Sequence, residues 1–168
     1  DLVGRSEATT WDDPVALAAV IDGASTVVNL AGKSVNCRYG AANRAEILRS
    51  RVETTGALAT AIAAAAQPPA LWINASTATI YRHAMDRPQT ESTGELGTGF
   101  SVSVARAWER ALFEPVLADT RRVALRMAIV LGDGSALRPL VALTKLGLGG
   151  PQCDGPWPVS RRRREAGT

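Results

Sequence analysis

The sequence predicts an α/β domain with a doubly wound parallel β-sheet. Short apolar, β-branched runs alternate with longer helical segments along its 168 residues, which is the pattern of successive β-α-β units. The runs are continuously apolar, as expected for strands that helices cover on both faces. With 46% hydrophobic and 21% charged residues, the chain can bury one ordinary core. We expect this domain over residues 1–150 and an irregular tail over residues 151–168.

The first predicted elements are the end of a strand, a short helix and a second strand. Residues 2–4 are expected to end a strand, because a polar loop follows them. Asp13 is a suitable N-cap for a helix over residues 14–21, with proline at the first helical position. Residues 25–30 form a β-branched run that predicts the next strand.

The middle of the chain predicts the longest helix, another strand and a third helix. Apolar residues at near-helical spacing predict a helix over residues 41–66, which two prolines end. Residues 70–76 predict a buried strand with a Ser/Thr-rich exit. A polar loop over residues 82–99 leads to a helix over residues 102–117.

The last predicted elements are a strand over residues 122–131 and a short helix over residues 136–146. A Gly-Asp-Gly turn separates them, and Pro139 is acceptable because it falls in the first helical turn. No internal repeat or domain linker precedes the tail.

The composition argues against several classes of function. Cys37 and Cys153 are far apart and match neither a disulfide framework nor a metal-binding motif, so we expect free thiols, no metal site and a cytoplasmic protein. The longest apolar stretch without a charge, residues 54–72, is broken by prolines and does not predict a membrane span. Residues 161–164 supply much of the net charge of +3. Because the body lacks a basic face with interleaved aromatics, we expect no nucleic-acid partner.

Candidate binding residues follow the predicted strands, since ligands of doubly wound sheets bind beyond the carboxyl ends of the strands. Leu30, Ala31 and Gly32 close one strand, where small residues let a flat ring or a ribose approach the backbone. Arg5 follows the first strand and could pair with a ribose 2′-phosphate, which would favour NADP over NAD. A solvated loop arginine is an equal alternative.

A series of motifs, in order, resembles the extended short-chain dehydrogenase/reductases. Residues 27–32 are similar to the fourth-strand motif of these enzymes, and residues 73–81 to their fifth strand with its Ser/Thr-rich exit. Residues 89–91 resemble their "P-x-T-E" loop, and residues 125–132 their sixth-strand "L-R-x-x-x-V-x-G". The resemblance implies a Rossmann-like domain that binds NADP or NAD.

Within that superfamily the chain looks most like atypical, epimerase-like proteins described as sugar-nucleotide epimerases. Residues 43–56 resemble their "I-x-x-S-R-V-x-x-T" helix, Trp108-Glu109 their "W-E" pair, and residues 147–155 their glycine-rich loop. The resemblance implies a small-molecule substrate, a sugar nucleotide or a similar carbonyl or hydroxyl compound.

The catalytic pattern of the family is only partly present. Thr77 occupies the Ser/Thr place that orients the substrate oxygen, but the Tyr and Lys places fall on Phe100 and Val104, which can neither exchange a proton nor hold a charge. Tyr81 is the nearest candidate acid or base, and a tyrosine at the sheet edge with its hydroxyl in water is the alternative. An ordinary phenol has a pKa near 10, so Tyr81 would need a nearby cation. The cations within plausible loop reach are Arg82, His83 and Lys33.

Four further residues are candidates for cofactor contacts. Asn74, Ala75 and Ser76 lie at the end of the predicted strand 70–76, and the polar side chains could instead satisfy backbone groups there. Arg51 is placed near the cofactor crevice only by the resemblance, and a solvated helix face is the equal alternative.

The resemblance also predicts that the chain is incomplete at both ends. The sequence has no G-x-x-G-x-x-G turn, the motif whose backbone N–H groups hold the cofactor pyrophosphate. We therefore expect a sheet without its first strand, whose unpaired edge would invite a partner strand, with a homodimer as one option. A non-catalytic NAD(P)-binding module or sensor, and an inactive truncated product, remain alternatives to an enzyme.

Overall fold

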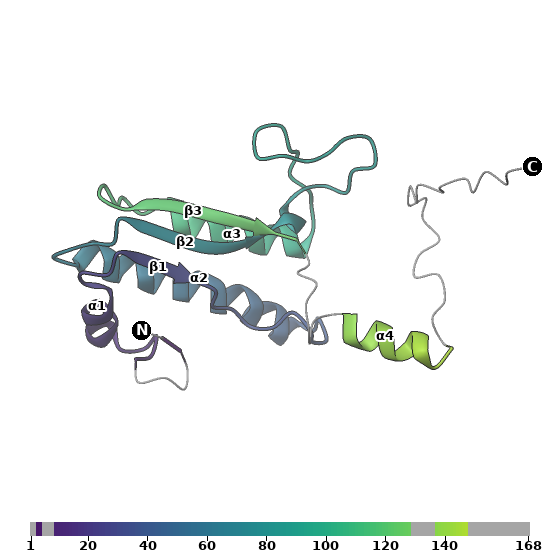
Figure 1. The fold of residues 1–168 in the computed structure, drawn as a ribbon, viewed down its shortest axis with the longest axis horizontal. Helices are drawn as coiled ribbons and strands as arrows, with labels where there is room; N and C mark the ends of the chain where they lie inside the picture. The colour runs from purple at the N-terminus through teal and green to yellow at the C-terminus, as the bar shows by residue number, and fades with distance from the viewer. Residues whose placement is uncertain (1–2, 5–8, 129–136, 148–168) are drawn as a thin grey trace, which may run out of the picture. The chain divides into compact units, whose positions relative to one another are not determined.

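The computed structural model describes residues 3–4, 9–128 and 137–147 (Figure 1). The chain divides into two compact units, Asp1–Ala128 and Ile129–Thr168. The first unit contains the sheet and its helices. In the second unit the described element is the helix α4 (Leu137–Lys145), close to the predicted helix over residues 136–146. The predicted domain boundary at residue 150 falls outside the described residues and stays a prediction.

The sheet consists of three parallel strands in sequence order. They are β1 (Thr26–Asn29), β2 (Leu71–Thr77) and β3 (Arg121–Met127). Asn29 and Asn74 are register partners across the first pair of strands, and Asn74 pairs with Ala124 across the second. The predicted α/β class with a parallel sheet is therefore confirmed.

The predicted strand end at residues 2–4 is wrong where the structure describes it. Val3 forms only an isolated bridge with Thr9. The Gly4 N–H donates to the Thr9 carbonyl at 3.1 Å, so this local pairing satisfies the backbone without a place in the sheet.

Three helices of the first unit follow the local signals of the sequence. The helix α1 (Pro14–Ile21) begins at Asp13, whose carboxylate accepts hydrogen bonds from the N–H groups of Val15 and Ala16. The helix α2 (Ala41–Ala64) is the longest, as predicted. The helix α3 (Phe100–Phe113) ends before the predicted residue 117, because Pro115 has no backbone N–H with which to continue the helical hydrogen bonds. A single 3₁₀ turn, η1 (Ala78–Ile80), follows β2.

Helices α2 and α3 lie on the same face of the sheet, behind it in Figure 1. This follows from the strand order, because two successive right-handed crossovers in one direction place both helices on one side. The core beneath them includes Trp72, which is 0% exposed, together with residues of α1. The prediction that helices cover both faces is not met by residues 3–128 as the structure describes them, since Val28 on the other face is 56% exposed.

Within the described part of the chain, no helix is both long enough and apolar enough to cross a membrane.

Candidate functional site

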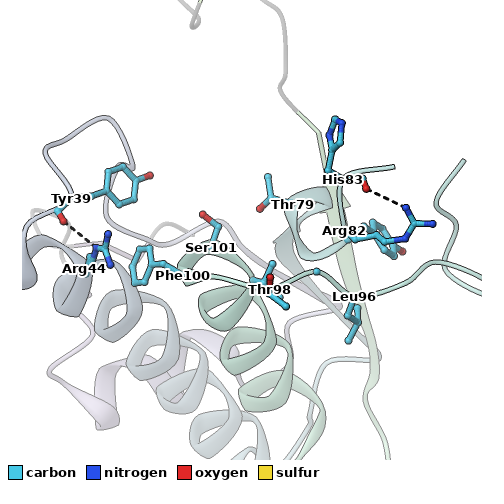
Figure 2. A pocket seen from close by; sticks show the side chains of 12 residues that line it. Tyr39, Arg44, Thr79, Arg82, His83, Leu96, Thr98, Phe100 and Ser101 are labelled. Carbon is cyan, nitrogen blue, oxygen red and sulfur yellow. Dashed lines mark hydrogen bonds between the residues drawn. The ribbon is translucent and has the colours of Figure 1, made fainter. Parts of the chain in front are cut away.

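A pocket of about 680 Å³ lies beyond the carboxyl end of β2 (Figure 2). Three segments build it: the loop and first turn of α2, the segment from η1 into the following loop, and the approach to α3 with its first turn. The lining residues are Tyr39, Arg44, Thr79, Tyr81, Arg82, His83, Leu96, Gly97, Thr98, Phe100, Ser101 and Val102. Of the described residues that the sequence predicted for the site, Tyr81 is the one that lines this pocket.

One wall of this pocket combines two aromatic rings with a cation. The Tyr39 and Phe100 rings meet edge to face with centroids 5.9 Å apart. The Arg44 guanidinium lies 5.1 Å from the Phe100 centroid, and its Nε donates to the Tyr39 carbonyl at 3.0 Å (Figure 2). Phe100, at the family's tyrosine place, thus faces the pocket without a hydroxyl, while Val104 is buried in the core.

Tyr81 lies in this pocket with its hydroxyl hydrogen bonded to a cation. Its backbone is fixed by a bridge to Leu96 and by its N–H, which donates to the Ala78 carbonyl. Arg126 of β3 donates from Nη1 to the Tyr81 Oη at 2.7 Å, and its guanidinium lies 5.1 Å from the ring centroid. This cation lies 45 positions from Tyr81 and is none of the loop cations Arg82, His83 and Lys33.

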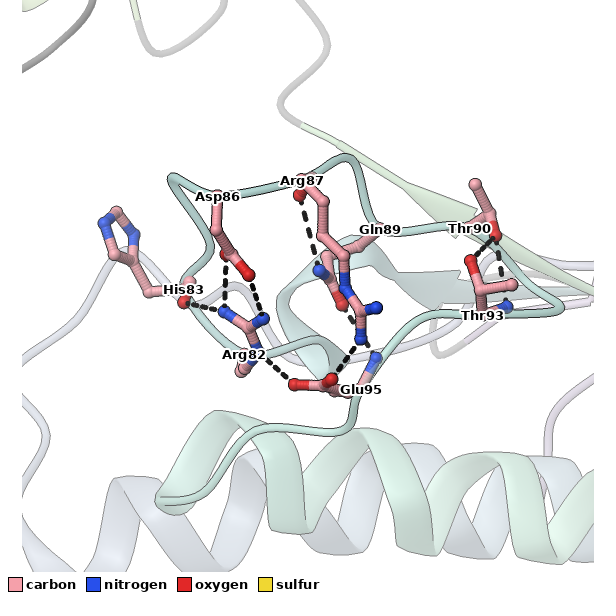
Figure 3. Close-up of polar contacts among 8 residues, drawn as sticks. All are labelled: Arg82, His83, Asp86, Arg87, Gln89, Thr90, Thr93 and Glu95. Atoms are coloured by element: carbon pink, nitrogen blue, oxygen red, sulfur yellow. Dashed lines mark hydrogen bonds and ion pairs between the residues drawn. The ribbon is translucent and has the colours of Figure 1, made fainter.

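Arg82, one of the cations that the sequence analysis did consider, is engaged within its own loop (Figure 3). Its Nη2 pairs with Asp86 at 2.8 Å, and its Nε pairs with Glu95, which also pairs with Arg87. The hydrogen bond from Arg82 is the main reason that the pKa of Asp86 is lowered to about 2. Arg82 therefore shapes the loop beside the pocket, while His83 is exposed at its rim.

Arg126 is held in place by Glu109 of α3. Its Nε and Nη2 donate to the two carboxylate oxygens of Glu109 at 2.9 and 2.8 Å. The Ser76 hydroxyl donates to the same carboxylate at 2.6 Å. Burial acts to raise the pKa of Glu109, but the hydrogen bonds from Arg126 and Ser76 and the charge of Arg126 together hold it below its usual value. The hydrogen bond to Glu109 likewise raises the pKa of Arg126.

Thr77 caps the turn that follows β2. Its Oγ1 accepts from the Thr79 N–H at 3.2 Å and shares a hydrogen bond with the Thr79 hydroxyl at 3.0 Å. Thr79 is the residue of this pair that lines the pocket. Thr79 and Ser101 are pocket hydroxyls that the sequence analysis missed, although the Ser/Thr-rich exit of β2 was the available signal for Thr79.

The exit of β1 contains the predicted binding residues Leu30, Ala31 and Gly32. Leu30 is 68% exposed, and the Ala31 N–H donates to the Asn29 side chain at 3.0 Å. Gly32 lies against Arg51, since a Cβ on Gly32 would be 3.0 Å from the Arg51 Cζ. The residues of this turn are therefore accessible. Their backbone is held by the side chains of Asn29 and Arg51.

Arg51 supports this turn from α2. Its Nη1 donates to the carbonyls of Lys33 and Ile47 at 3.1 and 3.0 Å, and its guanidinium lies 5.1 Å from the Trp108 ring. Burial lowers the pKa of Arg51 from its usual value. Arg51 therefore lies at the β1 exit and not on a solvated helix face. Its contact with a cofactor stays a prediction.

Asn74 belongs to a buried polar network that joins four elements. Asn29 donates to Asn74 at 2.7 Å and to Thr55 at 3.2 Å, and the Trp108 indole donates to Thr55 at 3.0 Å. Asn74 also donates to the Ala75 carbonyl at 2.8 Å. The side chains of Asn74 and Ser76 thus satisfy groups inside the domain, and their predicted cofactor contacts, like that of the buried Ala75, stay predictions.

Two other expectations concern Arg5 and metals. Arg5 lies outside the described residues. Among the residues that are described, no group of three or more His, Cys, Asp or Glu side chains is arranged to hold a metal ion.

Comparison with known proteins shows what the chain is similar to. No protein-family model matches it. The chain is 35% identical over 156 residues to the epimerase family protein SDR39U1 of Bos taurus, covering 88% of this chain and 52% of that relative. The solved structure of human SDR39U1, isoform 2, with NADPH has a TM-score of 0.77 and 33% identity, covering 89% of this chain and 52% of that one. A nucleoside-diphosphate sugar epimerase from Corynebacterium glutamicum has a TM-score of 0.64 and 28% identity, covering 92% of this chain and 32% of that one.

The parallel sheet, with crossover helices and a pocket at the strand exits, defines a Rossmann-like domain. The chain is homologous to epimerase family proteins and has the fold of the short-chain dehydrogenase/reductase type, as its motifs predicted. It spans about half the length of the SDR39U1 relatives named above.

Proposed function

We propose that the chain is part of an NAD(P)-binding, epimerase-like oxidoreductase that acts on a sugar nucleotide or a similar carbonyl or hydroxyl compound. The observation that supports this most is the Tyr81 hydroxyl in the pocket beyond β2, with the Arg126 guanidinium at 2.7 Å. A relative solved with NADPH and another named as a nucleoside-diphosphate sugar epimerase support the cofactor and the substrate class.

The β1 exit has small and apolar residues against which one part of a dinucleotide could lie. Ala31 and Gly32 are small, and the neighbouring Leu30 offers an exposed apolar surface to a flat ring. The bound cofactor would supply or accept the hydride. The 168 residues contain no G-x-x-G-x-x-G turn, so this exit would hold only part of the cofactor. The preference for NADP over NAD rests on Arg5 and on the NADPH of the human relative.

The residues of the pocket would bind the substrate and move its proton. Tyr81 would exchange the proton with the reacting oxygen, and the linked hydroxyls of Thr77 and Thr79 would orient that oxygen. Arg44 above Phe100 would attract an anionic group of the substrate.

A non-catalytic NAD(P)-binding module is the second candidate. The observation in its favour is Phe100, which presents a ring without a hydroxyl to the pocket, while Val104 is buried.

We also propose a cytoplasmic location and a homodimer through β1. Within the described residues this strand pairs only with β2, so its other edge is open to a partner strand.

Cofactor binding is tested first, by quenching of the four tryptophans with NADPH or NADH. Leu30→Asp places a negative charge at the β1 exit and should abolish binding, because the cofactor is itself anionic. Val116→Asp is the matched control, since Val116 is 92% exposed in the segment before β3, at the opposite sheet edge. Equal binding by both variants, or none by the folded wild type, would contradict the cofactor proposal.

Turnover then separates the enzyme from the module. UDP-glucose serves as the nucleotide-sugar probe, with NAD or NADP reduction measured at 340 nm and epimerised product measured by chromatography. We expect Tyr81→Phe to remove turnover and to leave NADPH binding unchanged. Turnover that survives in Tyr81→Phe excludes Tyr81 as the acid or base, whereas cofactor binding without turnover in the wild type favours the module.

A further inference from the structure

The contact between Tyr81 and Arg126 joins residues that are 45 positions apart in the chain. Tyr81 follows η1, whereas Arg126 belongs to β3. The register of the sheet places Arg126 beside Ser76 of β2. The position of the Tyr81 hydroxyl is therefore fixed by a residue of the sheet as well as by its own loop.

The orientation of Arg126 is set by Glu109. The two N–H···O bonds of 2.9 and 2.8 Å form a bidentate pair, which fixes the plane of the guanidinium as well as its position. With Nε and Nη2 engaged in this way, Nη1 is the group directed at the Tyr81 oxygen. The side chains are 24% and 13% exposed for Arg126 and Glu109, so water competes for these bonds less than at an open surface.

The carboxylate of Glu109 is itself fixed from the central strand. The Ser76 hydroxyl donates to it at 2.6 Å, and Ser76 is buried. A continuous chain of hydrogen bonds therefore runs from Ser76 through Glu109 and Arg126 to the hydroxyl of Tyr81.

The ring of Tyr81 is also limited by its loop. A Cβ on Gly94 would lie 2.4 Å from Cε1 of the ring and 2.4 Å from the Thr90 carbonyl oxygen. No side chain fits there without displacing the ring or the backbone. Glycine at this position lets the loop close directly on the tyrosine.

We propose that Glu109 and Arg126 are a positioning pair that sets the Tyr81 hydroxyl in the pocket. This inference rests on the proposed function for its catalytic meaning, but the positioning itself needs no cofactor or substrate. Arg126 places a fixed positive charge beside the phenol oxygen and sets the direction of the hydrogen bond to it. Glu109 acts on Tyr81 only through Arg126.

The test uses the scarcity of tyrosine in this chain. Tyr39 and Tyr81 are its two tyrosines, so Tyr39→Phe leaves Tyr81 as the single source of a ¹³Cζ-tyrosine NMR signal. In that background we expect Arg126→Lys to shift the signal most, because the bond to the phenol oxygen is lost. Glu109→Gln should shift it less and Ser76→Ala least, in the order of their distance along the hydrogen-bond chain.

The control is Arg122→Lys on the same strand. Arg122 donates to the carbonyls of Leu112, Phe113 and Pro115, so its replacement loosens β3 and α3 without touching Tyr81. We expect its Tyr81 signal to stay within the line width of the wild type. An equal shift in Arg122→Lys, or an unchanged signal in both Arg126→Lys and Glu109→Gln, overturns the proposal. Because no ligand is added, this result is independent of whether the chain binds NADPH or turns over UDP-glucose.

Discussion

The two faces of the sheet differ in how completely they are covered. The face beneath α2 and α3 presents Trp72, Asn74 and Ser76, all of which are buried. The opposite face presents apolar side chains that remain accessible, among them Leu125 at 42% exposure. Because the contribution of an apolar side chain scales with the area removed from water, the stability of this unit depends mainly on one face.

The covered face is also where the polar groups are organised. The amide of Asn29 and the indole of Trp108 meet at the Thr55 hydroxyl. The Trp72 indole nitrogen is the one buried side-chain N or O atom of the described residues that has no hydrogen-bond partner. Burial on this face is therefore accompanied by hydrogen bonding at nearly every polar side chain.

The largest expected difference between the faces is in core truncation. Leu112→Ala, at a site with 0% exposure in α3, should lower the free energy of unfolding by about 2–5 kcal/mol. Leu125→Ala makes the same chemical change on the accessible face and should cost on the order of 1 kcal/mol or less. Urea unfolding followed by tryptophan fluorescence measures both. Equal losses would mean that the second face is as well covered as the first.

The next difference concerns the buried network. Thr55→Val keeps the side-chain shape but leaves the Trp108 N–H and the Asn29 amide without this acceptor, which should cost about 1–3 kcal/mol. Thr54→Val is the matched control, because the Thr54 hydroxyl only bonds back to the carbonyls of its own helix, and its loss should stay within about 0.5 kcal/mol. The same urea experiment decides, and a Thr54→Val loss as large as that of Thr55→Val would show that the network adds no stability.

Local signals in the sequence were enough for most of the elements. Asp13 and the proline after it predicted the start of α1, and the near-helical apolar spacing predicted α2. These features depend on residues close together in the chain, so a single sequence reveals them. The exits of β1 and β2 were located for the same reason, since an exit is simply where a strand ends.

Features that depend on distant residues were not predictable in this way. The cation expected for Tyr81 was one in a nearby loop, but Arg126 reaches it from β3 because parallel strands align their carboxyl ends. The covering of a single face followed from strand order, which local patterns do not specify. The buried role of Asn74 likewise depends on its register partner Asn29.

The smallest expected effect on stability comes from Glu109, at the rim of the covered face, and it depends on pH. The pKa of Glu109 is lower in the folded chain than its usual value, since the hydrogen bonds from Arg126 and Ser76 outweigh the opposing effect of burial. The folded state therefore binds this proton less tightly than the unfolded state does, and the resulting stability is present above the unfolded pKa of about 4.3. That stability is lost as the pH falls through the lower, folded-state pKa.

Glu109→Gln should accordingly lower the free energy of unfolding by on the order of 1 kcal/mol at neutral pH, and this difference from wild type should shrink as the pH falls below about 4. Urea unfolding across a pH series measures it. Glu53→Gln is the control, because Glu53 pairs with Arg49 at the exposed surface of α2 and should contribute at most about 0.5 kcal/mol. A Glu109→Gln difference that stayed constant from neutral to acid pH would mean that the carboxylate charge does not stabilise the fold, and that Glu109 holds Arg126 by shape alone.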